Sequence, residues 1–367
     1  MTELSAEHRL KKLLNELVDI YSPSGKEEEV LEYVYDYLKS HGLPVERQEV
    51  DDNRYNLVVF PPENDIELAL VGHLDTVVAY DLDHYGFEEE DGTVSGLGTA
   101  DMKGGCAAMI EAMVSAWKEN TSPPPVGLCL VVGEEEEGDG AIELVKDYQF
   151  PWAIIGEPTD LRPCLSNYGY LELQVESRGK RAHASLADQV RNPLRVMLRI
   201  VLKIVRYLES ERPQVVYNIR DMWSSQAGFF IPDHCEAWLD LHIPPQSSIA
   251  EVMQEIEDIL DQDREERPDQ DANIRFATID AGYELPEKGH MVEALQAGYS
   301  RTGVQWAPVP FRSHSDATRL WEAGVRPVIL GPGKLEMAHS PEESIQMDQV
   351  QKAYELYREI IREVGSL

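Results

Sequence analysis

Hydrophobic and polar positions in the first part of the chain alternate between two periods. Apolar residues recur at helical spacing from Leu10 to Ile20, from Val30 to Leu38 and from Met102 to Glu119. Short uninterrupted apolar runs, typical of strands buried on both faces, lie at 67–71, 126–132 and 152–155. Helices that alternate with such strands predict an α/β fold with a mainly parallel central sheet.

The pattern changes after Asn167. The spacing then predicts strand, helix, strand, strand, helix and strand at Tyr170–Glu176, Pro193–Leu208, Val215–Ile219, Cys235–Ile243, Ile249–Leu260 and Asn273–Ala277. This βαββαβ order is that of a ferredoxin-like domain. From about Leu285 the α/β alternation resumes. We therefore expect a discontinuous α/β domain, residues 1–167 and 281–367, interrupted by an inserted lid, residues 168–280.

Composition and charge narrow the classes of partner. The 367 residues include 33 Lys and Arg against 67 Asp and Glu, a formal net charge of −34. Such a surface repels phosphate backbones and anionic lipids, so we expect neither nucleic acid nor a membrane as partner. The N-terminal residues contain no long apolar run, so we expect no signal peptide or membrane anchor and a cytoplasmic location. The four cysteines occur singly, and we interpret them as reduced thiols.

Candidate chemistry begins at the end of the first buried run, in the segment His73-Leu-Asp75. Residues two apart in an extended chain point to one face, so both side chains can reach the same place beyond the sheet. A metal-bound imidazole needs a partner on its other ring nitrogen, and a carboxylate suits that task. In isolation, the same two residues would also fit the ordinary hydrogen bonds of a strand end.

More acidic and imidazole groups lie near other predicted strand ends and helix starts, namely Asp101, Glu134 to Glu137, Glu157 and His339. Each has an ordinary alternative, since Asp101 would also cap a helix and the glutamate run would also be solvated loop charge. The carboxyl ends of parallel strands, however, meet at the edge where α/β sheets bind ligands. So many acids at one edge require a cation. The set favours two divalent metals, zinc first, with cobalt or manganese as alternatives.

Six motifs, in order HLDT, GTADMKGG, GEEEEGDGA, IIGEPTD, RGKRAHAS and GPGKLEMAHSPEE, resemble those of the M20 family of zinc peptidases and deacylases. That family includes acetylornithine deacetylase, succinyl-diaminopimelate desuccinylase and carboxypeptidases. The resemblance covers nearly the whole chain. It implies a zinc-exopeptidase-like catalytic domain that hydrolyses an amide bond with two metals, a metal-bridging water and a glutamate base.

The resemblance also implies which residues hold the metals. These residues are His73 and Glu157 for one ion, Glu136 and His339 for the other, and Asp101 between both. It further implies that the peptide bond between Asp101 and Met102 is cis.

Two further roles follow from the same resemblance. Asp75 would orient His73, and Glu135 would be the catalytic base, because the family places the base directly before the metal glutamate. Four glutamates follow one another here, so a register shifted by one residue, with Glu134 as base and Glu135 as ligand, stays open.

His183, in the inserted segment, would be a surface histidine if considered alone. In the family, the matching histidine crosses a dimer interface and hydrogen-bonds the oxyanion in the partner's site. The resemblance therefore implies a homodimer formed through the inserted domain, with His183 acting in trans.

The sequence departs from the family where substrates are held. The family often binds the substrate carboxylate with an Asn and, 13 residues later, an Arg, and here Phe229 and His242 stand in those places. Further candidate substrate contacts are Arg312, His314 and Gly331. We expect a deacylase that acts on a small N-acyl amino acid, with a di- or tripeptidase or a carboxypeptidase as alternatives. A non-catalytic binding protein on the same fold is the alternative from another class.

Overall fold

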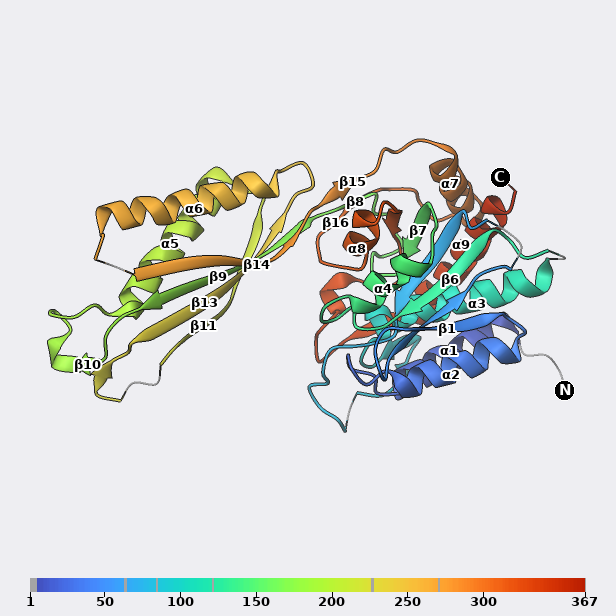
Figure 1. Cartoon of the computed structure of the whole chain (residues 1–367). Coiled ribbons are helices and arrows are strands. Elements are labelled where there is room, and N and C mark those ends of the chain that lie inside the picture. The colour runs from blue at the N-terminus through green and yellow to red at the C-terminus, as the bar shows by residue number, and fades with distance from the viewer. Residues whose placement is uncertain are drawn as a thin grey trace. The chain divides into compact units, whose positions relative to one another are not determined.

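The computed structural model describes residues 5–62, 65–83, 85–120, 122–225, 228–269 and 271–366 (Figure 1). The chain divides into two compact units. Unit 1 consists of Met1–Leu165, Leu285–Phe311 and Ser315–Leu367, and unit 2 of Ser166–Glu284 and Arg312–His314. The return of Arg312–His314 to unit 2 was not expected from the sequence. In the part of the chain that is described, no helix is both long and apolar enough to cross a bilayer.

A six-stranded sheet forms the centre of unit 1, in the order β1, β2, β6, β3, β7, β17. The neighbours β6, β3, β7 and β17 run parallel, whereas β1 pairs antiparallel with β2 and β2 with β6. The bounds are β1 Val45–Glu49, β2 Tyr55–Val59, β3 Leu68–His73, β6 Val126–Val131, β7 Trp152–Ile155 and β17 Arg326–Ile329. Every residue of β3, β6 and β7 is buried, which explains their uninterrupted apolar runs.

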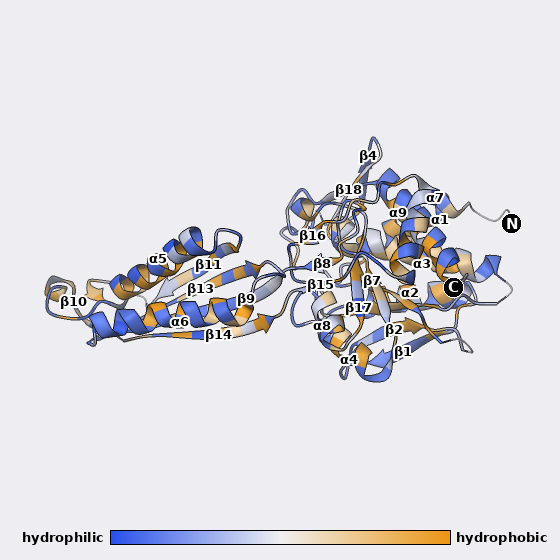
Figure 2. Cartoon of the chain, turned by 90° about the horizontal axis from the view of Figure 1, so that it is seen from above, coloured by the Kyte–Doolittle hydropathy of each residue, from blue (hydrophilic) through white to orange (hydrophobic). Residues whose placement is uncertain are grey.

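Helices cover both faces of this sheet (Figure 2). The connection from β3 to β6 runs along the sheet in the opposite direction to that from β6 to β7. Because crossovers between parallel strands are right-handed, α3 and α4 lie on opposite faces. Helix α3 packs against α1 and α9, whereas α4 packs against α8. The helices are α1 Ala6–Asp19, α2 Glu28–Ser40, α3 Gly104–Glu119, α4 Asp139–Asp147, α7 His290–Thr302, α8 Ala317–Glu322 and α9 Met347–Val364.

Unit 2 is built on four antiparallel strands in the order β11, β13, β9, β14. Along the chain the elements follow the predicted order, as β9 Gly169–Arg178, α5 Pro193–Glu211, β11 Val216–Ser224, β13 His234–Ile243, α6 Ile249–Glu266 and β14 Asp271–Asp280. Alternate residues of β9, such as Leu171 and Leu173, pack with apolar residues of α5 and α6 in one buried core. The helices therefore cover the face of the sheet on which these leucines lie. The polar residues that alternate with the leucines along β9 lie on the other face.

Several short elements complete the two units. They are β4 Glu88–Glu90, β5 Thr93–Ser95, β8 Ser166–Asn167, β10 Ala182–His183, β12 Phe230–Ile231, β15 Tyr283–Glu284, β16 Pro310–Phe311 and β18 Ser344–Gln346. Among these, β18 pairs with β5, and β5 pairs with β4. This small sheet matters for the site because it joins the segment after His339 to the segment before Asp101.

The parallel strands of unit 1 bring their carboxyl ends to one edge. Strand β3 ends at His73, the glutamate run follows β6, and Glu157 follows β7. Gly105, at the start of α3, makes the close packing at this edge possible. A Cβ at Gly105 would lie 2.2 Å from the carbonyl oxygen of Gly156. Helix α3 can therefore begin directly against the loop after β7 only because this residue has no side chain.

Candidate active site

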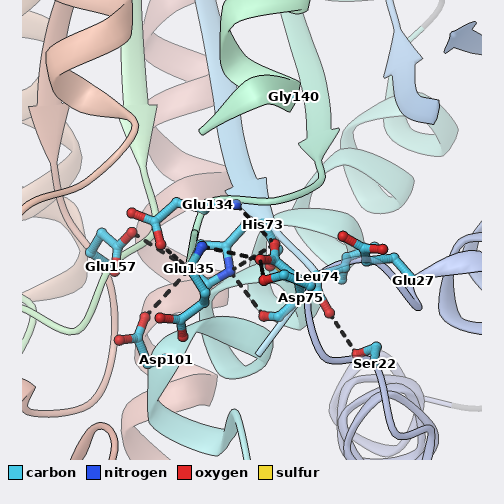
Figure 3. Close-up of polar contacts among 12 residues, drawn as sticks. Ser22, Glu27, His73, Leu74, Asp75, Asp101, Glu134, Glu135, Gly140 and Glu157 are labelled. Carbon is cyan, nitrogen blue, oxygen red and sulfur yellow. Dashed lines mark hydrogen bonds and ion pairs between the residues drawn. The ribbon is translucent and has the colours of Figure 1, made fainter. Parts of the chain in front are cut away.

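His73 lies at the centre of a group of buried carboxylates (Figure 3). Its side chain is 1% exposed, and its Nε2 atom is 3.5 Å from Oδ1 of Asp101, 3.6 Å from Oε2 of Glu134 and 3.7 Å from Oε1 of Glu157. The four residues come from the end of β3, the segment before α3, and the loops after β6 and β7. The fold thus brings together groups that lie far apart in the sequence.

Asp75 occupies the other side of the His73 ring. Nδ1 of His73 is 3.0 Å from the carbonyl oxygen of Asp75 and 3.5 Å from its Oδ1 atom. The Asp75 carboxylate also accepts hydrogen bonds from Ser24 Oγ at 2.7 Å and from the backbone N–H groups of Glu134 and Glu135 at 3.3 and 3.1 Å. Asp75 therefore fixes both the imidazole and the start of the glutamate run.

A second group shares Asp101 with the first. Nε2 of His339 is 2.8 Å from Oε2 of Glu135 and 3.5 Å from Oδ2 of Asp101. The ligand atoms of Asp101, Glu135 and His339 all lie within 4.8 Å of one another, as do those of His73, Asp101 and Glu157. Asp101 is thus common to two sets of three side chains.

The electrostatics of these groups show an excess of buried negative charge. Burial raises the pKa of Glu157 well above its ordinary value, and the neighbouring Asp101 and Glu134 raise it further. Burial likewise raises the pKa of Glu134. Burial lowers the pKa of His73, but the carboxylates of Asp101 and Asp75 outweigh it and raise that pKa well above normal. The cluster therefore concentrates buried negative charge that a divalent cation would compensate.

The residues present fit divalent metals. Nε2 of His73, Oδ1 of Asp101 and Oε1 of Glu157 are buried and have no hydrogen-bond partner among the described residues. Ligands about 2.0–2.2 Å from a tetrahedral zinc lie roughly 3.3–3.6 Å from one another. The spacing of 3.5 to 3.7 Å around His73 Nε2 is close to that geometry and too long for hydrogen bonds. Imidazole with carboxylates is also the donor set that zinc accepts.

Of the four glutamates in the run, Glu134 and Glu135 lie beside the two ligand groups. The sequence favoured Glu136 as ligand and Glu135 as base, but the structure places Glu135 beside Asp101 and His339. The side chain of Glu136 is exposed and lines a separate surface cavity of about 350 Å³ with Arg54 and Asp139. The reason is a long-range contact, because Asp75, about sixty residues earlier in the chain, accepts hydrogen bonds from the N–H groups of Glu134 and Glu135 and so turns these two residues toward the site.

Four other candidates from the sequence, His183, His242, Arg312 and His314, lie in unit 2. His183 is exposed, with Nδ1 2.8 Å from Ser185 Oγ. His242 lies opposite Tyr170 in the sheet, with ring centroids 5.5 Å apart, and its Nδ1 atom is buried without a hydrogen-bond partner among the described residues. His314 is 3.1 Å from Asp280. The guanidinium of Arg312 lies over the ring of Tyr168, at 5.9 Å.

Gly331, the remaining candidate substrate contact, lies in the loop after β17 and joins it to the loop after β7. Its N–H donates to Thr159 Oγ1, and its carbonyl oxygen accepts from the N–H groups of Thr159 and Leu161. Both backbone polar groups are therefore used to join the loops after β7 and β17. The predicted cis bond between Asp101 and Met102 is confirmed.

Sequence reasoning missed two buried acids near this site, Glu27 and Glu343. Neither follows a predicted strand, and each belongs to a segment with other glutamates, so nothing in the local pattern marks them. Glu343 accepts hydrogen bonds from the loop that carries Asp101, and Glu27 lies beside Asp75. Only long-range contacts identify them.

A site of imidazole and carboxylate ligands at the carboxyl edge of an α/β sheet is typical of metal-dependent hydrolases. The model of peptidase family M20/M25/M40 matches residues 69–363, so the chain belongs to this family and is a hydrolase, as the motifs predicted. A mixed α/β fold with a mainly parallel sheet is likewise confirmed.

Three relatives illustrate the range of the family. A probable carboxypeptidase of Aspergillus clavatus is 24% identical over 96% of this chain and 88% of its own length. Acetylornithine deacetylase of Myxococcus xanthus is 27% identical over 93% of each chain. The crystal structure of a tripeptidase from Staphylococcus aureus superposes with a TM-score of 0.83, at 21% identity, over 98% of this chain and 99% of its own. These similarities include peptidases and deacylases and do not select one substrate class.

Proposed function

We propose that this protein uses two divalent metal ions to hydrolyse the amide bond of a small N-acyl amino acid. Zinc is the favoured metal. The observation that carries the proposal is the pair of ligand groups that share Asp101. His73 and Glu157 would hold one ion, Glu135 and His339 the other, and Asp101 both. Two divalent ions at such a site supply Lewis acidity to the scissile carbonyl and lower the pKa of a neighbouring water.

Glu134 is the base in this proposal. Its carboxylate lies 3.6 Å from His73 Nε2, and its backbone N–H is fixed by Asp75. Burial raises the pKa of Glu134, the direction that favours a group that must accept a proton. Glu134 accepts a proton from the attacking water and returns it to the leaving amine. Asp75 keeps the His73 ring in place by holding its Nδ1 side.

His183 would stabilise the oxyanion from the partner subunit of a homodimer, as the family resemblance implies. Features of unit 2 support such an interface. Strand β11 is at the edge of its sheet in the described structure, and Val216, Ile219 and Trp223 on it are 42–49% exposed. Leu198 and Leu202 of α5 are 52% and 50% exposed. An unpaired strand edge and exposed apolar side chains are surfaces that a second copy could cover.

The relatives and two departures from the family's pattern bear on the nature of the substrate. The Myxococcus xanthus deacetylase aligns over nearly the whole chain and favours a deacylase, whereas the fold of the tripeptidase favours a peptidase. Phe229, where the family often has a carboxylate-binding Asn, is 89% exposed. Burial lowers the pKa of His242, where the family has Arg, so burial disfavours at this place the positive charge that a guanidinium would supply.

The test has two parts. Elemental analysis after mild dialysis of protein purified with zinc should find two metals per chain, and fewer than one contradicts the proposal. A panel of N-acyl amino acids, dipeptides and tripeptides should then show hydrolysis that chelators abolish and metal restores. Preference for peptides would replace the deacylase by the peptidase alternative. Two bound metals without hydrolysis of any amide would favour the non-catalytic alternative.

A further inference from the structure

Glu343 is a buried carboxylate at the end of the loop that carries His339. It is 4% exposed and directly precedes β18. Its Oε2 atom accepts a hydrogen bond from the N–H of Gly98 at 3.0 Å, and its Oε1 atom accepts from the N–H groups of Ala100 at 2.9 Å and Asp101 at 3.1 Å. One side chain therefore accepts hydrogen bonds from three N–H groups within four residues of the segment that carries Asp101.

These three N–H groups depend on Glu343 because of where they lie. They precede α3, so they are too early in the chain to bond within that helix. A buried N–H group that loses its hydrogen-bond acceptor costs free energy, because it has already given up its hydrogen bond to water. The segment between Gly98 and Asp101 is thus held in one conformation by a residue more than 240 positions away.

The backbone of the same residue strengthens this link. The carbonyl oxygen of Glu343 accepts from the N–H of Gly96, and the N–H of Glu343 donates to the carbonyl oxygen of Ser340. The neighbouring strand β18 pairs with β5, which directly precedes Gly96. The loop of His339 and the loop of Asp101 are therefore joined at Glu343, one carrying a ligand of the second group and the other the residue shared by both groups.

We propose that Glu343 is a positioning residue that holds the carboxylate of Asp101 between the two metals and so sets the affinity for the more weakly bound ion. This inference rests on the proposed two-metal function. Glu343 contacts the backbone of the Asp101 loop and is in neither ligand group, so it acts through Asp101. Loss of such a supporting partner typically lowers metal affinity or activity about 10–100-fold.

The experiment compares Glu343→Ala, Glu343→Gln and the matched control Glu342→Gln, an exposed neighbour. Metal-free protein is titrated with Co²⁺ by calorimetry and by visible absorption, and the zinc-loaded enzymes are assayed for kcat and KM. Glu343→Ala should weaken the second Co²⁺ about 10–100-fold, alter the Co²⁺ spectrum and lower kcat more than it raises KM. Glu343→Gln should rescue part of each loss, because its oxygen can still accept two of the N–H groups. Glu342→Gln should match the wild type.

Folded Glu343 variants with wild-type Co²⁺ affinities and spectrum would overturn the inference, even if their melting temperature falls. Where Glu343→Ala does not fold, the Glu343→Gln variant gives the same decision. Failure of the proposed function has a different signature, because the wild type itself would then fail to bind two metals.

Discussion

Buried acidic residues differ in their hydrogen-bond and ion-pair partners between the two units of this molecule. In unit 2, Asp263 is buried on α6, and its carboxylate accepts from Nε and Nη2 of Arg199 at 2.9 Å and lies 3.0 Å from Lys203 Nζ. Burial raises the pKa of Asp263, but the two cations outweigh it and lower that pKa below its usual range. This acid is fully satisfied by the protein.

In unit 1, Asp101 and Glu157 are buried with oxygen atoms that no donor of the described residues reaches. Burial raises the pKa of Glu157, and the neighbouring charge of Asp101 raises it further. The comparison shows that the number of acids does not mark a functional site, since both units contain many. What distinguishes the site is that several buried acids with unpaired oxygens lie together beside an imidazole, so that an external cation would compensate their charge.

The largest expected effect is at the base. Glu134→Ala should lower kcat about 10²–10⁴-fold while both metals stay bound, since the residue removes a proton and holds no ion. Glu135→Ala should lose metal as well as rate. Steady-state kinetics together with metal analysis distinguish the two.

Glu136→Ala is the matched control for that pair, because its side chain is exposed and lies outside both ligand groups. It should keep both the metals and the rate. If Glu136→Ala lost a metal and Glu135→Ala kept both, the register first favoured from the sequence would be the correct one.

A somewhat smaller loss is expected at His183. His183→Ala should lower the rate on the order of 10²–10³-fold, the usual effect of removing one oxyanion donor. Mixed with Glu134→Ala, it should regain activity, because half of the sites in each heterodimer combine an intact Glu134 with the partner's intact His183. Random exchange makes about a quarter of all sites whole. No recovery in heterodimers verified by mass spectrometry would place His183 outside this role.

In unit 2 the expected change affects stability alone. Asp263→Asn should lower the free energy of unfolding by about 1–3 kcal/mol at pH 7, because Arg199 and Lys203 lose their charged acceptor. The native pKa of Asp263 is lowered, so its contribution is complete above the ordinary value of 3.8 and is lost as the pH falls through the native pKa. Urea unfolding at several pH values should show the deficit shrink below that point. Metal content should not change.

The control for that measurement is Asp261→Asn. Its carboxylate is 67% exposed and pairs with Arg264 at the surface, so the substitution should cost well under about 1 kcal/mol. Equal losses at both positions would remove the distinction between satisfied buried acids and surface acids.

The smallest expected effect is at Glu27, a buried acid of unit 1. Both oxygens of Glu27 are buried and accept no hydrogen bond of normal geometry from the described residues, and Nη1 of Arg54 is 3.8 Å from Oε1 of Glu27. Burial raises the pKa of Glu27, so the native state holds its proton more tightly than the unfolded chain and loses stability as the pH rises above 4.5. Glu27→Gln removes this loss and should stabilise the protein on the order of 1 kcal/mol at pH 8.

Thermal or urea unfolding from pH 5 to pH 8 measures this gain, which should grow with pH. Glu29→Gln, an exposed acid of the same helical turn, should show no such trend. A gain for Glu27→Gln that does not depend on pH would contradict the interpretation.

The sequence alone predicts the helices and strands that have a local pattern of hydrophobic and polar positions. Strand β6 is apolar throughout and β3 is apolar up to His73, and helix α3 was predicted to its observed end at Glu119 because its apolar residues recur with the helical period. Strand β1 escaped prediction because two exposed residues separate its buried Val45 and Gln48, so it has no simple period. The candidates His73, Asp101, Glu157 and His339, which the structure brings together, were identified because each lies near a strand end or in a recognisable motif.

Only the three-dimensional contacts determine which of several adjacent glutamates lie at the site. Four consecutive glutamates are equivalent in sequence, and the choice of Glu134 and Glu135 depends on their N–H groups reaching Asp75, about sixty residues earlier. Glu343 is one of two adjacent glutamates, and only its contacts with the Asp101 loop distinguish it from Glu342. Hydrogen bonds between distant segments select one residue from a run of equals, and no local pattern of hydrophobic and polar positions encodes that choice.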